Sequence, residues 1–444
     1  MGKFHKYLGY NLFVGILLLV SMDLRGQFLM DMLDTTKEMG KGFLSMYKRF
    51  DHVRMSGYIQ PQYQIASSEG AVGYAGGNFS EFSNNRFMLR RGRIRFDYVR
   101  YDQSEQPRLQ FVFQFDGTER GVVIRDFWGR YWGGKSRMFY FTTGMFARPF
   151  GYEVNLSSAD REAPERGRMS QILMKTERDI GFMASFEPNR KNGLFKYLKI
   201  DAGIFNGQGL SGTMEFDRYK DFIGQVMIKP MNVSSKLSLG GGVSMLSGGF
   251  RQFAHAAWRL NMQSGNIPFY EKDSLTSGIG DKLPRKYFGV NAQARWDHGW
   301  GNTQVRAECW QGTQTASRYS SETPGTPQFL PDGSAEENFV RDFNGAFILF
   351  LQDLGSKRHQ LGIKLDWYDP NRRVSGLQIG HGSTNLNAAD IRYNTLGGGY
   401  LLYLNDNLKL TFWYDHIRNE QTQLPGLQKD LRDDFFTARV QFRF

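Results

Sequence analysis

Apolar and polar side chains alternate at every second position through most of this chain. The clearest case is the last segment, where four polar residues alternate with Phe436, Ala438, Val440, Phe442 and Phe444. A strand repeats every two residues and a helix every 3.6, so the pattern predicts a protein built from β-strands. A soluble sandwich also alternates, because one face of each sheet meets a core and the other meets water. Alternation alone therefore does not choose between a sandwich and a membrane barrel.

Segment length and the rhythm of the connections favour the barrel. Sixteen segments have about the 9 to 11 residues that a tilted strand needs to cross a bilayer. They are 54–65, 86–101, 107–116, 122–132, 137–147, 179–187, 195–205, 218–229, 235–247, 285–297, 301–313, 342–353, 358–369, 389–403, 406–418 and 432–444. Short turns and long polar loops alternate between them, except at 117–121. Because outer-membrane barrels segregate turns and loops in this way, the sequence predicts an all-β, 16-stranded antiparallel transmembrane barrel over residues 51–444.

The N-terminus predicts export from the cytoplasm. Residues 1–26 resemble a secretory signal peptide, because Lys3 and Lys6 precede the apolar stretch 12–20. That stretch is too short to span a membrane, and no later run approaches the length of a membrane helix. Residues 27–50 then space their apolar side chains along one face, so we predict a short periplasmic amphipathic helix there. A loosely ordered leader fits the same residues equally well.

Composition excludes several kinds of site. Cys309 is the one cysteine, so neither a disulfide framework nor a zinc site built on thiolates can form. His381 and His416 have no partner at metal-ligand spacing, and the chain has no nucleophile elbow or HExxH motif. The basic run 90–95 alternates with apolar residues and follows an export signal, which argues against nucleic acid as a partner. The sequence thus predicts no enzyme, no catalytic residues, no metal site and no cofactor.

Arginines are the candidate solute-binding residues. Three of them share one face of the segment 86–101, namely Arg91, Arg93 and Arg95. Residues on one face of a strand are about 6.5 to 7 Å apart. An Arg on the lipid face costs roughly 2 to 4 kcal/mol at mid-bilayer, so this ladder is expected to face the lumen. Further lumen candidates are Arg108, Arg130, Arg148, Arg166 and Arg168. A guanidinium group donates two parallel hydrogen bonds to an oxyanion such as phosphate, so the ladder predicts an anion-binding channel.

Neighbouring carboxylates leave a second interpretation open. Five of them lie on the same strands or in the segment 148–178: Asp97, Asp116, Asp126, Glu162 and Glu165. If they pair with the arginines, the constriction is charged across its width and only mildly anion-selective. A further alternative is a barrel without an open channel, which carries an outer-membrane enzyme or an adhesin.

Several motifs between residues 54 and 190 add a family resemblance. They are FMLRRGRIR at 87–95, QFD at 114–116, RDFW at 125–128, GMFARPFG at 144–151, and ER at 165–166 followed by RDIG at 178–181. Together they resemble the phosphate-selective porin O and P family, and the segments 56–63 and 85–87 resemble its Bacteroidetes branch.

This resemblance implies several expectations about the assembled protein. Family members are sixteen-stranded barrels of the Gram-negative outer membrane, usually homotrimers, and contact lipid on the outside. Their third outer loop, here 148–178, folds inward and narrows the channel. Basic residues at the constriction bind small anions such as phosphate. The terminal Phe444 is part of the signal that the assembly machinery reads.

Overall fold

The computed structural model describes most of the chain after the N-terminal region. The described residues are 52–103, 105–134, 137–188, 193–211, 215–263, 267–273 and 278–444. The chain divides into two compact units, Met1–Val53 and Arg54–Phe444, and the account below concerns the second. The predicted signal peptide at 1–26 and the predicted helix at 27–50 lie outside the described residues. Among the described residues, no helix combines the length and the apolar character needed to cross a membrane.

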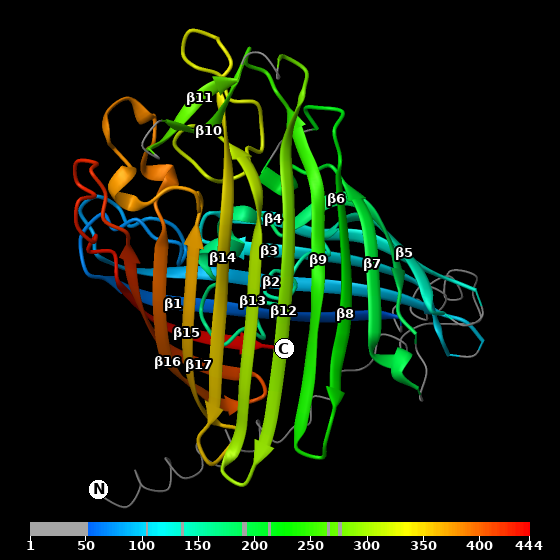
Figure 1. Cartoon of the computed structure of the whole chain (residues 1–444). Coiled ribbons are helices and arrows are strands. Elements are labelled where there is room, and N and C mark those ends of the chain that lie inside the picture. The colour runs from blue at the N-terminus through cyan, green and yellow to red at the C-terminus, as the bar shows by residue number, and fades with distance from the viewer. Residues whose placement is uncertain are drawn as a thin grey trace, which may run out of the picture. The chain divides into compact units, whose positions relative to one another are not determined.

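Sixteen strands of the described residues form one closed antiparallel barrel (Figure 1). They are β1 (Val53–Ala66), β2 (Asn85–Tyr101), β3 (Pro107–Thr118), β4 (Gly121–Gly133), β5 (Phe139–Ala147), β6 (Arg178–Phe186), β7 (Leu198–Phe205), β8 (Asp221–Asn232), β9 (Leu237–Arg251), β12 (Lys282–His298), β13 (Gly301–Ala316), β14 (Asn338–Asp353), β15 (His359–Asp369), β16 (Tyr393–Asn405), β17 (Leu408–Asn419) and β18 (Phe435–Arg443).

Neighbours in sequence are neighbours in this barrel. Each strand pairs with the next, β9 pairs with β12, and β18 pairs with β1 to close the ring. In Figure 1 the strands β12 to β15 of the near wall cross β2 and β3 of the far wall, as the tilted strands of a barrel do. Every predicted segment overlaps one of these strands, so the predicted fold class is confirmed.

The barrel turns its apolar side chains outward and its polar side chains inward. On β3, Phe111 and Phe113 are 40% and 38% exposed, whereas Gln114 and Asp116 are 7% and 9% exposed. A soluble protein has the opposite distribution, because water favours polar atoms at the surface and apolar atoms in the core. A continuous apolar outer face is instead what lipid requires. This distribution excludes the soluble sandwich.

Elements outside the barrel wall were not predicted. The segment 248–284 was expected to be a loop, but it contains a hairpin of β10 (Ala257–Gln263) and β11 (Ile267–Asp273), and β10 also runs beside β14 in parallel. Each hairpin strand has 7 residues, too few to meet a criterion based on crossing the bilayer.

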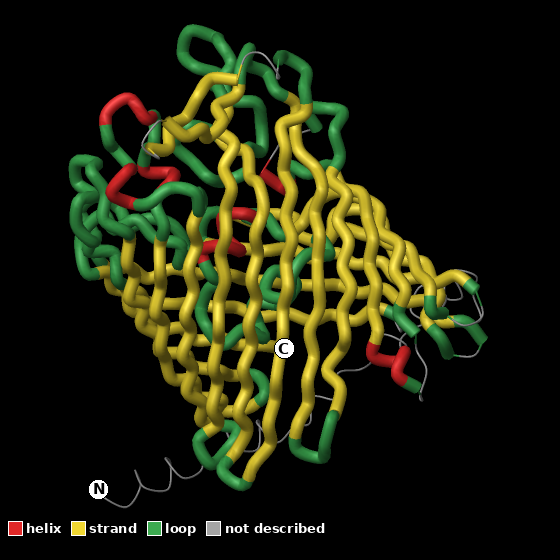
Figure 2. The backbone as a smooth tube through the Cα atoms, in the orientation of Figure 1, coloured by secondary structure: helices red, strands yellow, loops and turns green. Residues whose placement is uncertain are grey.

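The helices of the described residues lie in the connections. They are α3 (Arg168–Leu173), η2 (Leu194–Tyr197), η3 (Gly209–Ser211), η4 (Gly376–Gln378), η5 (Gly382–Thr384) and η6 (Ala388–Asp390). Figure 2 shows long connections, several of them carrying these helices, crowded at one end of the barrel.

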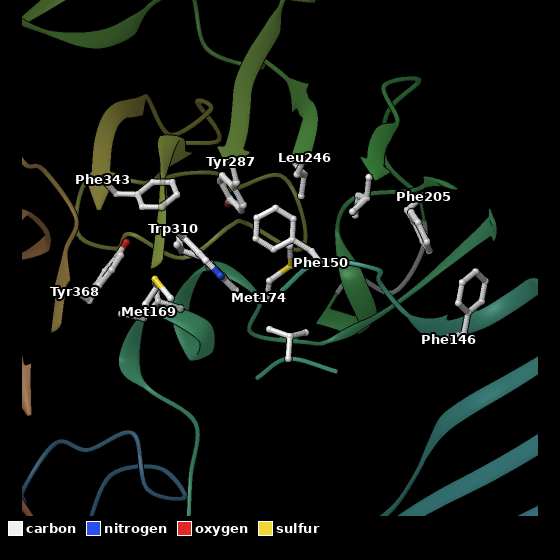
Figure 3. Packing of buried hydrophobic residues seen from close by; sticks show 14 of the residues in the cluster. Phe146, Phe150, Met169, Met174, Phe205, Leu246, Tyr287, Trp310, Phe343 and Tyr368 are labelled. Atoms are coloured by element: carbon white, nitrogen blue, oxygen red, sulfur yellow. The ribbon is translucent and has the colours of Figure 1, made fainter. Parts of the chain in front are cut away.

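A cluster of apolar side chains also lies on the inner face of the wall. Phe150 of the segment 148–178 packs edge-on against Trp310 of β13 and Tyr287 of β12, with ring centroids 4.8 and 5.9 Å apart. Met169 and Met174 from the same segment join this cluster (Figure 3). The inner face of a channel-forming barrel is usually polar. Here the inner face is apolar because the segment 148–178 packs against the wall and covers these side chains.

Candidate functional site

Ion pairs attach the segment 148–178 to strands on one side of the barrel. Its Glu153 pairs with Lys364 of β15. Its Glu162 accepts hydrogen bonds from Arg306 of β13, at 2.8 and 3.0 Å. All four side chains are largely buried, and the two bonds to Arg306 have the parallel geometry that strengthens an Arg–carboxylate pair. These contacts hold the segment against β13 and β15.

Glu165 attaches the same segment to two further strands. Its carboxylate accepts hydrogen bonds from Arg90 and Arg91 of β2, at 2.9 and 2.6 Å, and from Arg439 of β18 at 2.8 Å. Burial alone raises the pKa of Glu165, but the three guanidinium groups outweigh it and hold that pKa well below its ordinary value. Glu165 is therefore ionised at neutral pH and joins β2, β18 and the segment 148–178.

The arginine ladder of β2 faces inward, and every one of its members has a carboxylate partner. Arg91 bonds to Glu165, and Arg93 lies 2.9 Å from Asp116 of β3. Arg95 lies 2.6 Å from a third carboxylate, that of Asp97 on its own strand. The pairing follows from register, since Asp116 stands directly opposite Arg93 across the ladder. The structure thus has the paired arrangement that the sequence left open.

Arg108 and Arg130 lie in different surroundings. Arg108 is exposed near the start of β3 and donates a hydrogen bond at 2.9 Å to the hydroxyl of Tyr131, which is itself 43% exposed on the outer face. The structure does not bring Arg108 to the other candidates. Arg130 is half-buried on the inner face of β4, where its Nε donates to Thr142 Oγ1 at 2.9 Å.

The remaining candidates lie within the segment 148–178, where two of them bond to its C-terminal end and the third contacts the barrel wall. Arg148 donates to the backbone carbonyl of Thr176. Arg166 lies 3.1 Å from the carboxylate of Glu177. Arg168 places its guanidinium carbon 3.7 Å from the centre of the Tyr393 ring on β16. These three side chains fix the course of the segment.

A cavity of about 490 Å³ lies between residues 155–159 and the inner faces of β1 to β8 and β18. Among the described residues that line it, the basic ones are Arg93, Arg95, Arg125, Arg130, Arg178, Lys199 and Arg443, and the acidic ones are Asp126, Glu177 and Asp201. Three further carboxylates, those of Asp97, Asp116 and Asp160, pair with these cations, so seven basic groups face six acidic ones and a small positive excess remains. A cleft with an excess of one sign of charge concentrates ions of the opposite sign, so this excess favours anions.

Arg125 belongs to this lining although the alternation did not predict it. It bonds to Glu177 at 2.6 Å. On strict alternation Arg125 shares the outward face of Phe127, but the register slips here, because Gln114 and Phe115 of β3 pair with residues 126 and 124 of β4. The extra residue forms a β-bulge, which turns Arg125 inward. Two outward apolar residues three positions apart, 124 and 127, are the sequence signal of this bulge.

Comparisons with known proteins agree with the architecture. No family model and no curated protein sequence matches the chain. The outer membrane channel DcaP of Acinetobacter baumannii is similar in structure, with a TM-score of 0.54 and 12% identity over 88% of this chain and 97% of that one. OprB of Pseudomonas putida is also similar, with a TM-score of 0.51 and 8% identity over 92% and 97% of the two chains. At such low identity, the similarity shows the shared barrel fold alone.

Proposed function

We propose that the protein is an outer-membrane channel through which small solutes diffuse passively, and that anions are preferred. The observation that carries this proposal is the cationic cavity inside the barrel. The apolar outer face supports a position in lipid. DcaP, whose barrel is similar, is itself an outer membrane channel, which agrees with the proposal.

The finer parts of the proposal rest on sequence and chemistry. Residues 1–26 direct export, and the segment 148–178 narrows the lumen of a barrel that assembles as a homotrimer. Phosphate-like anions are the proposed solutes, because a guanidinium fork matches an oxyanion and because the motifs between residues 54 and 190 resemble phosphate-selective porins. The proposed host is a Gram-negative bacterium of the Bacteroidetes.

Recording from planar lipid bilayers tests the proposal. The purified full-length chain should produce discrete, ohmic current steps in potassium chloride. Adding phosphate should reduce the chloride current more than adding the same concentration of a neutral sugar does. A barrel that only carries an enzyme or an adhesin would produce no current steps, and that result would reject the channel.

A further inference from the structure

One cationic side chain of the cavity differs from all the others. Six of the seven basic side chains that line it form an ion pair with a carboxylate, at distances from 2.6 to 3.2 Å. Within the part of the chain that the structure describes, Arg130 forms none. An ion pair cancels much of the field that a guanidinium group exerts on a passing anion. Arg130 therefore contributes the least compensated positive charge to the cavity.

Strand register explains why Arg130 has no carboxylate partner. Its neighbours directly across the ladder are Gln110 on β3 and Thr142 on β5, and both are neutral. The hydroxyl of Thr142 accepts the hydrogen bond from Nε. This bond fixes the guanidinium plane and uses one of its five N–H donors.

Aromatic rings hold the Arg130 guanidinium group in place. Its central carbon lies 4.5 Å from the ring centre of Tyr140, 4.9 Å from that of Trp128 and 5.6 Å from that of Trp132. A cation–π contact orients a guanidinium group and contributes about 0.5 to 2 kcal/mol, yet it leaves the net charge in place. The site thus holds a cation rigidly without neutralising it.

Trp128 gives this site a flat apolar wall. Its half-buried side chain lines the same cavity as Arg130. An oxyanion on the guanidinium fork can therefore place an attached flat group against the indole ring, and such stacking adds to the charge-assisted hydrogen bonds. Inorganic phosphate or acetate has no such group and gains only the hydrogen bonds.

We infer that Arg130 and Trp128 form the principal anion-binding site of the cavity, and that this site prefers oxyanions carrying a flat apolar body, such as aromatic carboxylates. The inference rests on the proposed channel function, which it deepens by naming the site and the class of solute. Arg130 supplies the charge and the fork, whereas Trp128 supplies the selectivity between one carboxylate and another.

Benzoate and acetate are suitable probes, because they carry the same charged group. Each anion is added to full-length channels in potassium chloride, and the apparent dissociation constant is taken from the reduction in chloride current. Benzoate should bind more tightly than acetate. Arg130→Gln should weaken benzoate binding about tenfold, since a charge-assisted hydrogen bond contributes that much. Trp128→Leu should weaken benzoate binding several-fold and acetate binding much less, because Thr142, Tyr140 and Trp132 still hold the guanidinium group.

Arg443→Gln is the matched control. It removes the same charge from the same cavity, but from a guanidinium group that is paired with Asp160. If the two glutamine variants weaken benzoate binding equally, or if Arg130→Gln has no effect, the inference is wrong while the channel function stands. If the wild type carries no current, the channel function itself fails.

Arg130→Lys covers the case in which the glutamine variant does not fold. Lysine keeps the unit charge but has no planar fork. This variant should retain most of the anion preference in potassium chloride and lose most of the discrimination between benzoate and acetate. Unchanged discrimination in Arg130→Lys would overturn the inference.

Discussion

The two sides of the lumen use inward-facing charges differently. The clamped wall, formed by β13, β15, β18 and β2, gives its Lys and Arg side chains to carboxylates of the segment 148–178. The cavity wall, formed by β3 to β8, pairs Arg178 and Lys199 with carboxylates of its own strands, leaves Arg130 without an ion pair among the described residues, and borders a cavity of about 490 Å³. Strand alternation places polar groups inward on both sides. The difference shows that the segment 148–178 decides which of these charges a solute can reach.

Detaching the segment 148–178 from the clamped wall should have the largest effect on thermal stability and conductance. Glu165→Gln removes the charge that compensates two buried guanidinium groups and one partly buried one, and breaking a buried ion pair on one side costs about 3 to 5 kcal/mol. We expect this variant to unfold at a lower temperature, measured by heat-modified mobility on a gel. Its single-channel conductance should rise, because the segment 148–178 is held less firmly.

Asp160→Asn is the control for that variant. Asp160 lies in the same segment, but its pair with Arg443 is exposed on both sides. An exposed pair contributes at most about 1 kcal/mol, so thermal stability and conductance should stay near those of the wild type. Equal effects in the two variants would show that Glu165 is not a clamp.

Removing the arginine ladder of β2 should have the next largest effect, which is on ion selectivity. Replacing Arg91, Arg93 and Arg95 together with Ala takes away three positive charges while their three carboxylate partners remain. Chloride preference should fall, measured as a shift of the reversal potential in a potassium chloride gradient. A reversal potential identical to that of the wild type would show that the arginine ladder does not contribute to the ion selectivity of the channel.

The smallest effect should come from mild acid. The pKa values of Glu165 and Glu177 lie well below their ordinary value of 4.5, because arginines outweigh the effect of burial. A lowered carboxylate pKa stabilises the folded protein fully above the ordinary value, and this stabilisation is lost as the pH falls through the lowered pKa. The difference in conductance between the wild type and Glu165→Gln should therefore be the same at pH 8 and at pH 5, and shrink only well below pH 4.5. A change in this difference between pH 8 and pH 5 would contradict the role of Glu165.

The strands could be predicted because lipid imposes a local rule on each of them. Every wall strand must show apolar side chains outward, so Phe111 and Phe113 identify β3 without knowledge of its neighbours. No such rule applies outside the bilayer. The hairpin of β10 and β11 was missed for this reason, since its strands are short and pair with each other beyond the wall.

The partners of the arginines could not be predicted in the same way. Arg91 bonds to Glu165, which lies 74 residues further along the chain, and only the path of the segment 148–178 brings the two together. Arg93 and Arg130 look alike in sequence, but register places Asp116 opposite the first and Thr142 opposite the second. The alternation of apolar and polar residues predicts which arginines face inward. Only the strand register shows which of these arginines has no carboxylate opposite it.

The reversal potential of the wild-type protein tests the central claim most directly. The full-length chain is inserted into a planar bilayer that separates two concentrations of potassium chloride, and the voltage at zero current is recorded. A cationic lumen open to small solutes predicts a potential with the sign of chloride selectivity. A potential with the sign of potassium selectivity, or the absence of any current, would contradict the account.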